Sequence, residues 1–182
     1  MRVLILTLFS EISGSSRIIA YQFLPFLEKA GIKCRAESIY PDKFFKVQMG
    51  LEKTGKIQKQ LNFVFYLFLG ILKQVYFSIE SRNYDVVFIQ RTPFPKSIYS
   101  LLLCMNPNVI YEFEDTFYEV NPFLKKGFLR RLLLNYQRGL YKNMVEKAAR
   151  IIAVNEYVAG EAGTVNKNIT IIIPITNQIT AP

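Results

Sequence analysis

Small and charged residues gather just after the first apolar segment of the chain. Residues 3–9 are mainly apolar, and Gly14, Ser15, Ser16 and Arg17 follow them. A glycine-serine turn that leads from a strand into a helix presents backbone N–H groups, which bind phosphate or carboxylate oxygens. We therefore expect this turn to contact an anionic ligand, with Arg17 as a cationic partner. The alternative is a tight turn in which a serine only caps the helix.

Three carboxylates follow one another in a second cluster, at Glu112, Glu114 and Asp115. Neighbouring carboxylates in a partly closed cleft raise the pKa of at least one of them, which suits proton transfer or the binding of hydroxyl groups. We take Asp115 and Glu114 as the catalytic candidates and Glu112 as an additional one. The alternative is a solvated loop, or a pairing with Arg91 across neighbouring strand ends.

Polar residues also end the apolar run 85–90, where Arg91 and Thr92 precede a proline. The carboxyl ends of parallel strands meet at one edge of a sheet, so we expect Arg91 and Thr92 to lie at the same ligand-binding edge. The cysteines, Cys34 and Cys104, have no metal-ligand spacing, and the chain has no histidine. The sequence therefore suggests no metal site, and a reduced, cytoplasmic compartment fits best.

Composition limits the partners of the chain. Its 182 residues are 51% hydrophobic and carry a formal net charge of +9, which suits one domain with anionic partners. Nucleotide phosphates, nucleic acid and an anionic membrane all meet that description. We predict no nucleic acid, because many aromatic residues lie in apolar runs that look buried instead of being available for stacking on bases.

The elements that must position these residues alternate along the chain. Apolar runs predict strands at 3–9, 33–39, 85–90, 109–113, 151–154 and 169–173, and helical spacing predicts helices at 15–30, 57–80, 95–103, 122–150 and 156–162. Residues 40–56 form an ordered loop or a short helix. In the first helix Pro25 predicts a kink and Gly31 a left-handed end. We predict an α/β fold, a three-layer Rossmann-like sandwich with a mostly parallel sheet of about six or seven strands.

Two apolar segments raise the question of a membrane. Residues 63–72 are too few to span a bilayer, which needs about 20 apolar residues, and are interpreted as a mostly buried core helix. The alternative is that part of this helix, with lysines nearby, faces a membrane or a partner domain. In residues 123–134 Lys125, Lys126, Arg130 and Arg131 interleave with bulky apolar residues, as in membrane-surface segments. We expect these four cations to face the membrane, with a solvated face as the alternative.

Seven segments, taken in order, carry a resemblance to a known family. They are RVLILT at 2–7, GSSR at 14–17, FLEKAGI at 26–32, YDVVFIQ at 84–90, VIYEFED at 109–115, AARIIAVNEY at 148–157 and IIIPITN at 171–177. Their order and spacing resemble the N-terminal domain of a GT-B fold glycosyltransferase of the glycosyltransferase family 4 type. The resemblance adds Asn155 and Glu156 to the donor- or acceptor-binding candidates.

The resemblance implies an acceptor-side domain over 1–174, the start of an interdomain linker at 175–182, and a donor-binding domain that is absent from this chain. It implies sugar transfer from a nucleotide sugar, as substrate and without a cofactor or metal, to a glycan or lipid-linked acceptor with retention of configuration. Bacterial surface polysaccharide synthesis on the inner face of the membrane is the expected context. The chain lacks the family's pair of glutamates eight positions apart and its cleft histidine. The alternative is a self-contained Rossmann-like module that binds a nucleotide or a protein.

Overall fold

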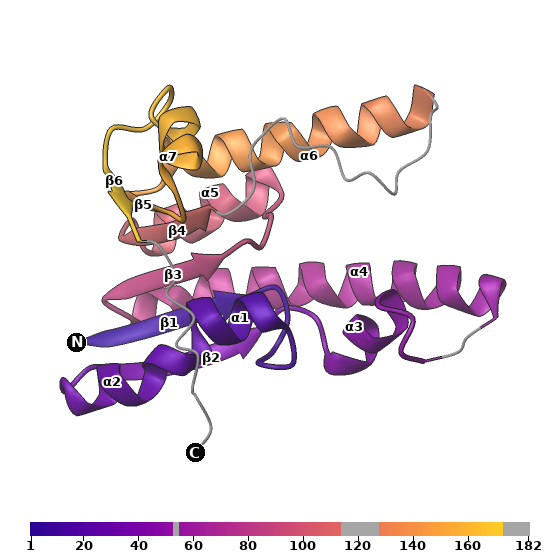
Figure 1. The fold of residues 1–182 in the computed structure, drawn as a ribbon, viewed down its shortest axis with the longest axis horizontal. Coiled ribbons are helices and arrows are strands. Elements are labelled where there is room, and N and C mark those ends of the chain that lie inside the picture. Colours follow the sequence, from indigo (N-terminus) through magenta and orange to yellow (C-terminus); the bar gives the residue numbers. More distant parts are fainter. Residues whose placement is uncertain (53–54, 114–127, 173–182) are drawn as a thin grey trace, which may run out of the picture.

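The computed structural model describes residues 1–52, 55–113 and 128–172. Six parallel strands form one sheet in the order β2-β1-β3-β4-β5-β6 (Figure 1). The strands are β1 (Arg2–Thr7), β2 (Lys33–Ser38), β3 (Val86–Gln90), β4 (Val109–Phe113), β5 (Arg150–Ala153) and β6 (Ile169–Ile171). Helices flank the sheet, so the predicted α/β, Rossmann-like fold class is confirmed.

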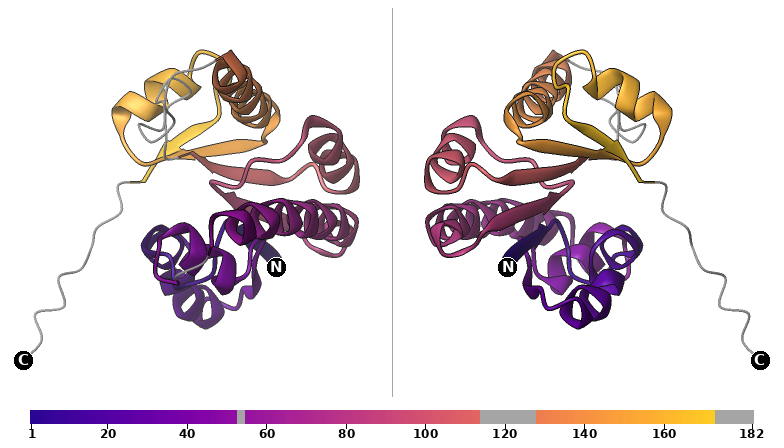
Figure 2. Two further views of the ribbon diagram at one scale, coloured as in Figure 1. Left: turned by 90° about the vertical axis from the view of Figure 1, so that its right-hand side faces the viewer. Right: turned by 90° about the vertical axis from the view of Figure 1, so that its left-hand side faces the viewer.

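The helices divide between the two faces of the sheet (Figure 2). They are α1 (Gly14–Ile19), η1 (Tyr21–Phe23), α2 (Leu24–Lys29), α3 (Asp42–Gln48), α4 (Lys56–Glu80), η2 (Ser81–Asn83), α5 (Lys96–Met105), α6 (Phe128–Lys147) and α7 (Glu156–Ala162). In β1, Leu4 and Leu6 join a large core with residues of α4, α5, α6 and α7. Val3 and Ile5 point to the other face, where they join a smaller core with Ala20, which follows α1, and with residues of η1 and α2. This alternation follows from the two-residue period of a strand that is covered on both faces.

The first helical segment differs from the single kinked helix that we predicted. Helix α1 ends at Ile19, a 3-10 turn follows, and α2 begins at Leu24. Pro25 thereby lies in the first turn of α2, where a missing N–H costs no intrahelical hydrogen bond. Gly31 adopts a φ of 77°, which confirms the expected left-handed end of this segment.

Helix α4 also differs from expectation, because its apolar stretch is not mostly buried. Leu61, Val64 and Phe68 are each about three-fifths exposed, at 66%, 65% and 58%. The amino-terminal half of α4 extends past the sheet and lies beside α3, where Phe44 contacts Tyr66 (Figure 1). In the described part of the chain, residues 57–83 are the one segment long and apolar enough to cross a membrane, by length and composition only.

Two buried asparagines tie helix ends to the amino edge of the sheet in the same way. Asn106, before β4, donates from Nδ2 to the carbonyls of Ser81 and Tyr84 at 3.0 and 2.7 Å. Its Oδ1 accepts the N–H of Asn108 at 2.9 Å. We call this arrangement an asparagine clamp.

The second asparagine clamp lies before β6. Asn166 donates to the carbonyls of Val145 and Ala148 at 2.7 and 2.9 Å, and accepts the N–H of Asn168 at 2.8 Å. In the sequence both asparagines fall between predicted elements, and no role was expected for their side chains. Asn106 precedes β4 and holds the end of η2, which leads into β3. Asn166 precedes β6 and holds the end of α6, which leads into β5. Each clamp therefore fixes the strand that lies beside the strand it precedes.

Candidate functional site

The described site residues that the sequence singled out lie along the carboxyl edge of the sheet. Gly14 and its neighbours follow β1, Arg91 and Thr92 follow β3, and Asn155 begins the turn after β5. Thr7, Gln90 and Glu112 pair in register at the ends of β1, β3 and β4. The chain runs from β1 outward to β2 and then returns across β1 to β3, so the strand order reverses between β1 and β3. Open α/β sheets bind ligands at such a switch point.

The hydroxyl of Ser16 joins the first turn of α1 to the end of β3 at the switch point. It donates a 3.2 Å hydrogen bond to Oε1 of Gln90, and both residues are buried. The Nε2 of Gln90 has no hydrogen-bond partner among the described residues, so it is a buried donor at this edge. Ser16 therefore acts first as a support that fixes the start of α1 against β3.

The segments that follow β1 and β2 line a hollow of about 660 Å³ at this edge, which we call the edge hollow. Its lining residues are Ser10, Glu11, Ile12, Arg17, Tyr21 and Asp42. Among the predicted residues, Arg17 lines the edge hollow, and Gly14 and Ser15 lie in the same turn with Gly14 exposed. The carboxylates of Glu11 and Asp42 were missed, because Glu11 lies in the loop after β1 and Asp42 begins α3, and only the fold brings these segments together.

The edge hollow combines one cation with two carboxylates and two hydroxyls. Ser10 Oγ donates to Asp42 Oδ1 at 2.5 Å, and in the described structure Arg17 makes no ion pair. Burial raises the pKa of Tyr21 although its contact with the Thr7 hydroxyl acts in the opposite direction, so Tyr21 is a neutral hydroxyl at neutral pH. Such a set suits a ligand that offers both hydroxyl donors and an anionic group.

Arg91 and Thr92 turn the chain sharply at the end of β3. Arg91 has a φ of 53°, a left-handed conformation that is uncommon outside glycine. Its N–H approaches the carbonyl of Glu112 at 3.4 Å, while Thr92 is buried and donates its hydroxyl to the Gln90 carbonyl at 3.0 Å. Arg91 is half-buried at the edge, whereas the buried Thr92 stabilises the turn through its hydroxyl.

Asn155 and Glu156 start α7 at the same edge. Asn155 Oδ1 accepts the N–H of Val158 at 2.8 Å, which makes Asn155 the N-cap of the helix, and Glu156 is exposed in the first turn. An acidic side chain in that turn is favourable beside the positive end of the helix dipole. Asn155 therefore has a structural role in addition to the ligand contact that the resemblance implies.

Several expected residues fall outside the described part of the chain. Glu114, Asp115, Lys125 and Lys126 lie in the segment that the structure leaves undescribed, and of Arg130 and Arg131 it gives only the backbone, in the first turn of α6. Glu112 is described and fully buried. It is the member of the carboxylate cluster that the structure places at the carboxyl edge.

A larger cavity of about 900 Å³ opens on the α1 face of the sheet. Its lining is almost wholly apolar and includes Phe23, Phe26, Phe88, Ile110 and Ile152. Glu112 is the one predicted candidate among its lining residues. This cavity accepts an apolar group, and its walls offer little that recognises phosphate or sugar. The apolar runs of the strands indicate apolar side chains on both faces of the sheet. They do not indicate that part of the α1 face is left open as a cavity.

Comparison of the chain with protein-family models finds no match, and comparison with curated proteins finds none. The case for a function therefore comes from the fold and from the residues at the carboxyl edge.

Proposed function

We propose that the chain is the acceptor-side domain of a glycosyltransferase that moves a sugar from a nucleotide sugar to a glycan or lipid-linked acceptor. One observation carries the proposal: the strand order reverses between β1 and β3, and the edge hollow with Arg17, Glu11 and Asp42 lies at the same carboxyl edge, between the segments that follow β1 and β2. Doubly wound sheets bind nucleotide-containing and phosphorylated ligands outside the carboxyl ends of their strands, at such a reversal. The segments that resemble family 4 transferases include the edge residues from Gly14 to Arg17.

In the proposed reaction the acceptor hydroxyl oxygen bonds to the anomeric carbon, and the bond from that carbon to the donor diphosphate breaks. Glu11 and Asp42 accept hydrogen bonds from sugar or acceptor hydroxyls, and Arg17 offsets the negative charge of a phosphate. Glu114 and Asp115 remain the candidates that take the acceptor proton. By the resemblance the anomeric configuration is retained and no metal takes part.

The proposal requires a donor-binding domain that closes over the carboxyl edge, supplied by further polypeptide or by a partner subunit. Binding energy from that closure holds donor and acceptor in reacting positions. Bacterial surface polysaccharide synthesis, on the cytoplasmic side of the membrane, is the context that we propose. The sugar itself is left open by the residues of this domain.

The test is a donor screen with the product of the whole reading frame that encodes this chain. Nucleotide sugars are offered with a membrane lipid extract, and the release of nucleoside diphosphate is measured. We expect one donor to give release that depends on the extract, and Arg17→Gln to lower kcat/KM at least about tenfold, the effect of one charge-assisted hydrogen bond. Arg82→Gln, an exposed arginine in η2 at the opposite edge, is the matched control and keeps wild-type activity.

Nucleotide binding by the isolated 182-residue chain separates the two candidate functions. An acceptor-side domain binds nucleotides and nucleotide sugars weakly or not at all in calorimetry, because its partner domain holds most of the donor. Micromolar or tighter binding, together with no transfer by the complete product, would overturn the proposal in favour of a self-contained nucleotide-binding module.

A further inference from the structure

Helix α4 carries a continuous apolar face that no described segment covers. Six of its residues, which we call the outer stripe, are Ile57, Leu61, Val64, Phe65, Phe68 and Leu72. Their exposed fractions lie between 49% and 75%. Spacings of three and four residues place them on one side of the helix, over a length of about 22 Å. Tyr76 and Ile79, also exposed, continue the stripe toward the carboxyl end of α4.

In the carboxyl-terminal half of α4, the side that faces the protein is less apolar than the outer stripe. Gly70, Gln74 and Ser78 are buried there together with Phe77. An ordinary surface helix has the opposite arrangement, with its apolar side toward the core and its polar side toward water. The outer stripe is therefore built for a nonaqueous neighbour outside the described chain.

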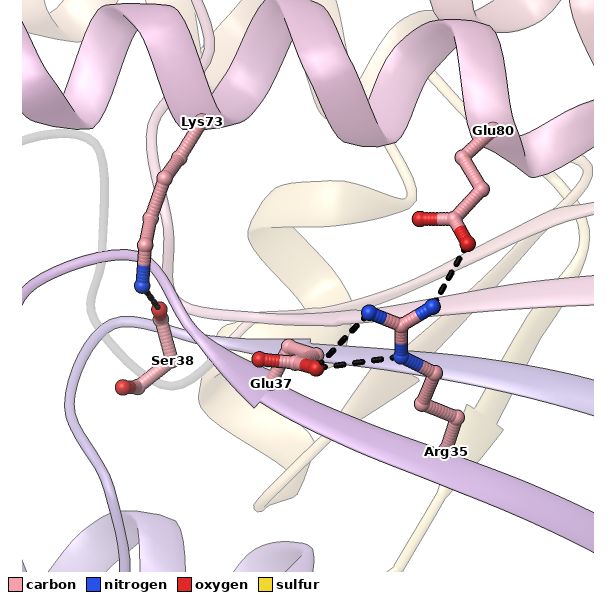
Figure 3. A network of polar contacts seen from close by, with 5 residues as sticks. All are labelled: Arg35, Glu37, Ser38, Lys73 and Glu80. Carbon is pink, nitrogen blue, oxygen red and sulfur yellow. Dashed lines mark hydrogen bonds and ion pairs between the residues drawn. The ribbon is translucent and has the colours of Figure 1, made fainter.

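Polar contacts hold the carboxyl-terminal half of α4 along the sheet. Lys73 Nζ donates to the carbonyl of Ser38 at 2.9 Å, and Arg35 of β2 bridges to Glu80 at 2.5 Å (Figure 3). Gln74 Nε2 donates to the carbonyl of Pro93 at 3.1 Å. To cross a bilayer α4 would have to leave these partners. A helix that stays attached along one side presents its stripe in the plane of a surface.

The charge of the chain distinguishes between two neighbours, a second copy and an anionic lipid surface. No Asp or Glu occurs between Lys56 and Ile79, Lys59 and Lys73 lie on α4, and the net charge is +9. Two copies meeting through this face bring like charges together, whereas an anionic leaflet attracts them. Phenylalanine and leucine are typical of the buried side of helices that lie in a membrane surface.

We propose that α4 lies in the surface of an anionic lipid bilayer, with the outer stripe in the boundary between headgroups and acyl chains. The amino-terminal halves of α4 and α6 extend past the sheet in the same direction (Figure 1). The first turn of α6 contains Arg130 and Arg131, so two basic helix starts lie at that end of the molecule. The inference is independent of the transferase proposal, since lipid binding requires neither donor nor acceptor.

The absence of tryptophan from the chain provides a direct test. Phe68→Trp puts a single fluorophore in the outer stripe, and Tyr157→Trp puts one at an exposed site on α7. With vesicles of phosphatidylcholine and phosphatidylglycerol we expect the emission of the Phe68→Trp variant to shift to the blue and to be quenched by brominated lipid. The emission of the Tyr157→Trp variant keeps its wavelength. Equal emission shifts and equal quenching in the Phe68→Trp and Tyr157→Trp variants contradict the proposal.

Vesicle cosedimentation tests the same surface by loss of binding. Leu61→Gln/Phe68→Gln is expected to weaken binding to anionic vesicles at least about tenfold, while Tyr157→Gln/Ile171→Gln, which changes exposed side chains of α7 and β6, binds as the wild type does. Circular dichroism checks that each variant is folded. The proposal is overturned if the wild-type chain does not bind anionic vesicles. It is also overturned if the wild-type chain forms a dimer that the Leu61→Gln/Phe68→Gln substitutions dissociate. Neither result bears on transferase activity.

Discussion

Ser16 Oγ lies 3.2 Å from Gln90 Oε1, and this hydrogen bond joins the start of α1 to the end of β3 inside the protein. Ser16→Ala leaves the amide oxygen of Gln90 buried without that donor, which we expect to lower the free energy of unfolding by about 1–3 kcal/mol. Urea denaturation measures the loss. Ser15→Ala, a half-buried neighbour, is the control and should cost less than about 0.5 kcal/mol. Equal losses contradict a special role for Ser16.

Gly70 of α4 is expected to resist replacement by alanine, although alanine normally stabilises a helix. A Cβ at this position would lie 2.5 Å from Cε1 of Tyr40. The Tyr40 ring cannot easily move, because it packs against the rings of Phe9 and Phe44. Gly70→Ala should therefore lower the free energy of unfolding by about 1–3 kcal/mol, measured by urea denaturation.

The control for Gly70 is Gly139, in α6, where a Cβ would meet nothing within 4 Å. Gly139→Ala should raise the free energy of unfolding by up to about 1 kcal/mol, the helix preference of alanine over glycine. If Gly70→Ala and Gly139→Ala change the free energy of unfolding in the same direction, the contact with Tyr40 is not the reason that position 70 requires glycine.

The contrast between α7 and α4 shows how far the sequence predicts this fold. Helix α7 was expected at the same residues that it occupies, from its helical spacing, and the structure adds the capping role of Asn155. For α4 the helix itself was predicted correctly, but its environment was not. Periodicity reports that one side of a helix is apolar and says nothing of what covers that side. Which part of α4 is covered depends on where α3 and α5 end. The positions of these ends are set by tertiary packing.

Asn106 is expected to be far more sensitive than its exposed neighbours. Asn106→Asp replaces a donor to two carbonyls with an acceptor, which leaves the carbonyls of Ser81 and Tyr84 facing an oxygen. We expect a loss of about 2–4 kcal/mol in the free energy of unfolding. Asn83→Asp, at an exposed position in η2, makes the same chemical change and should stay within about 0.5 kcal/mol. Thermal and urea unfolding of both variants compare them.

Tyr99 and Tyr111 should make the fold sensitive to alkaline pH. Burial raises the pKa of both phenols above the ordinary value of 10.0. The folded state therefore keeps these protons where the unfolded chain loses them, so the contribution of the two phenols to stability is constant below about pH 10 and falls above it. Each buried phenol contributes a slope of up to about 1.4 kcal/mol per pH unit in that range.

Tyr99→Phe separates the contribution of one phenol. The variant also loses a 3.2 Å hydrogen bond to the Met144 carbonyl, so it is less stable at neutral pH, but its stability should fall less steeply above about pH 10. Urea titrations at several pH values measure the slope. Tyr157→Phe, at an exposed position, should keep the wild-type slope. An unchanged slope in Tyr99→Phe contradicts the assignment.

The two thiols should differ in reactivity. Cys104 is exposed, whereas Cys34 is half-buried and its pKa is raised by burial and by the nearby carboxylate of Glu28. At mildly alkaline pH a disulfide reagent should modify Cys104 first, because the thiolate is the reacting form. The Cys104→Ser variant isolates the slow reaction of Cys34, and adding Glu28→Gln to it should make that reaction faster. A faster reaction at Cys34 than at Cys104 contradicts the expectation.

The candidate site could be predicted only where a strand or the turn after it marks the place. Arg91 was singled out because it comes just after a recognisable strand, and Arg17 because the glycine-serine turn leads from the first strand into its helix. Glu11 lies in the loop after β1 and Asp42 is the first residue of α3, and nothing in their sequence spacing indicates that they share one hollow. The pairing of β1 with β2 brings the segments after these strands together, and this long-range geometry has no local signature.

The two asparagine clamps make the fold sensitive to substitution at Asn106 and Asn166 and tolerant of substitution at the residues that they hold. Each clamp binds main-chain oxygens, at Ser81 and Tyr84 in one case and at Val145 and Ala148 in the other. A main-chain oxygen is present whatever side chain the residue carries. The clamped helix ends can therefore diverge freely in sequence while the connection is kept, and each crossover depends on the identity of a single amide side chain.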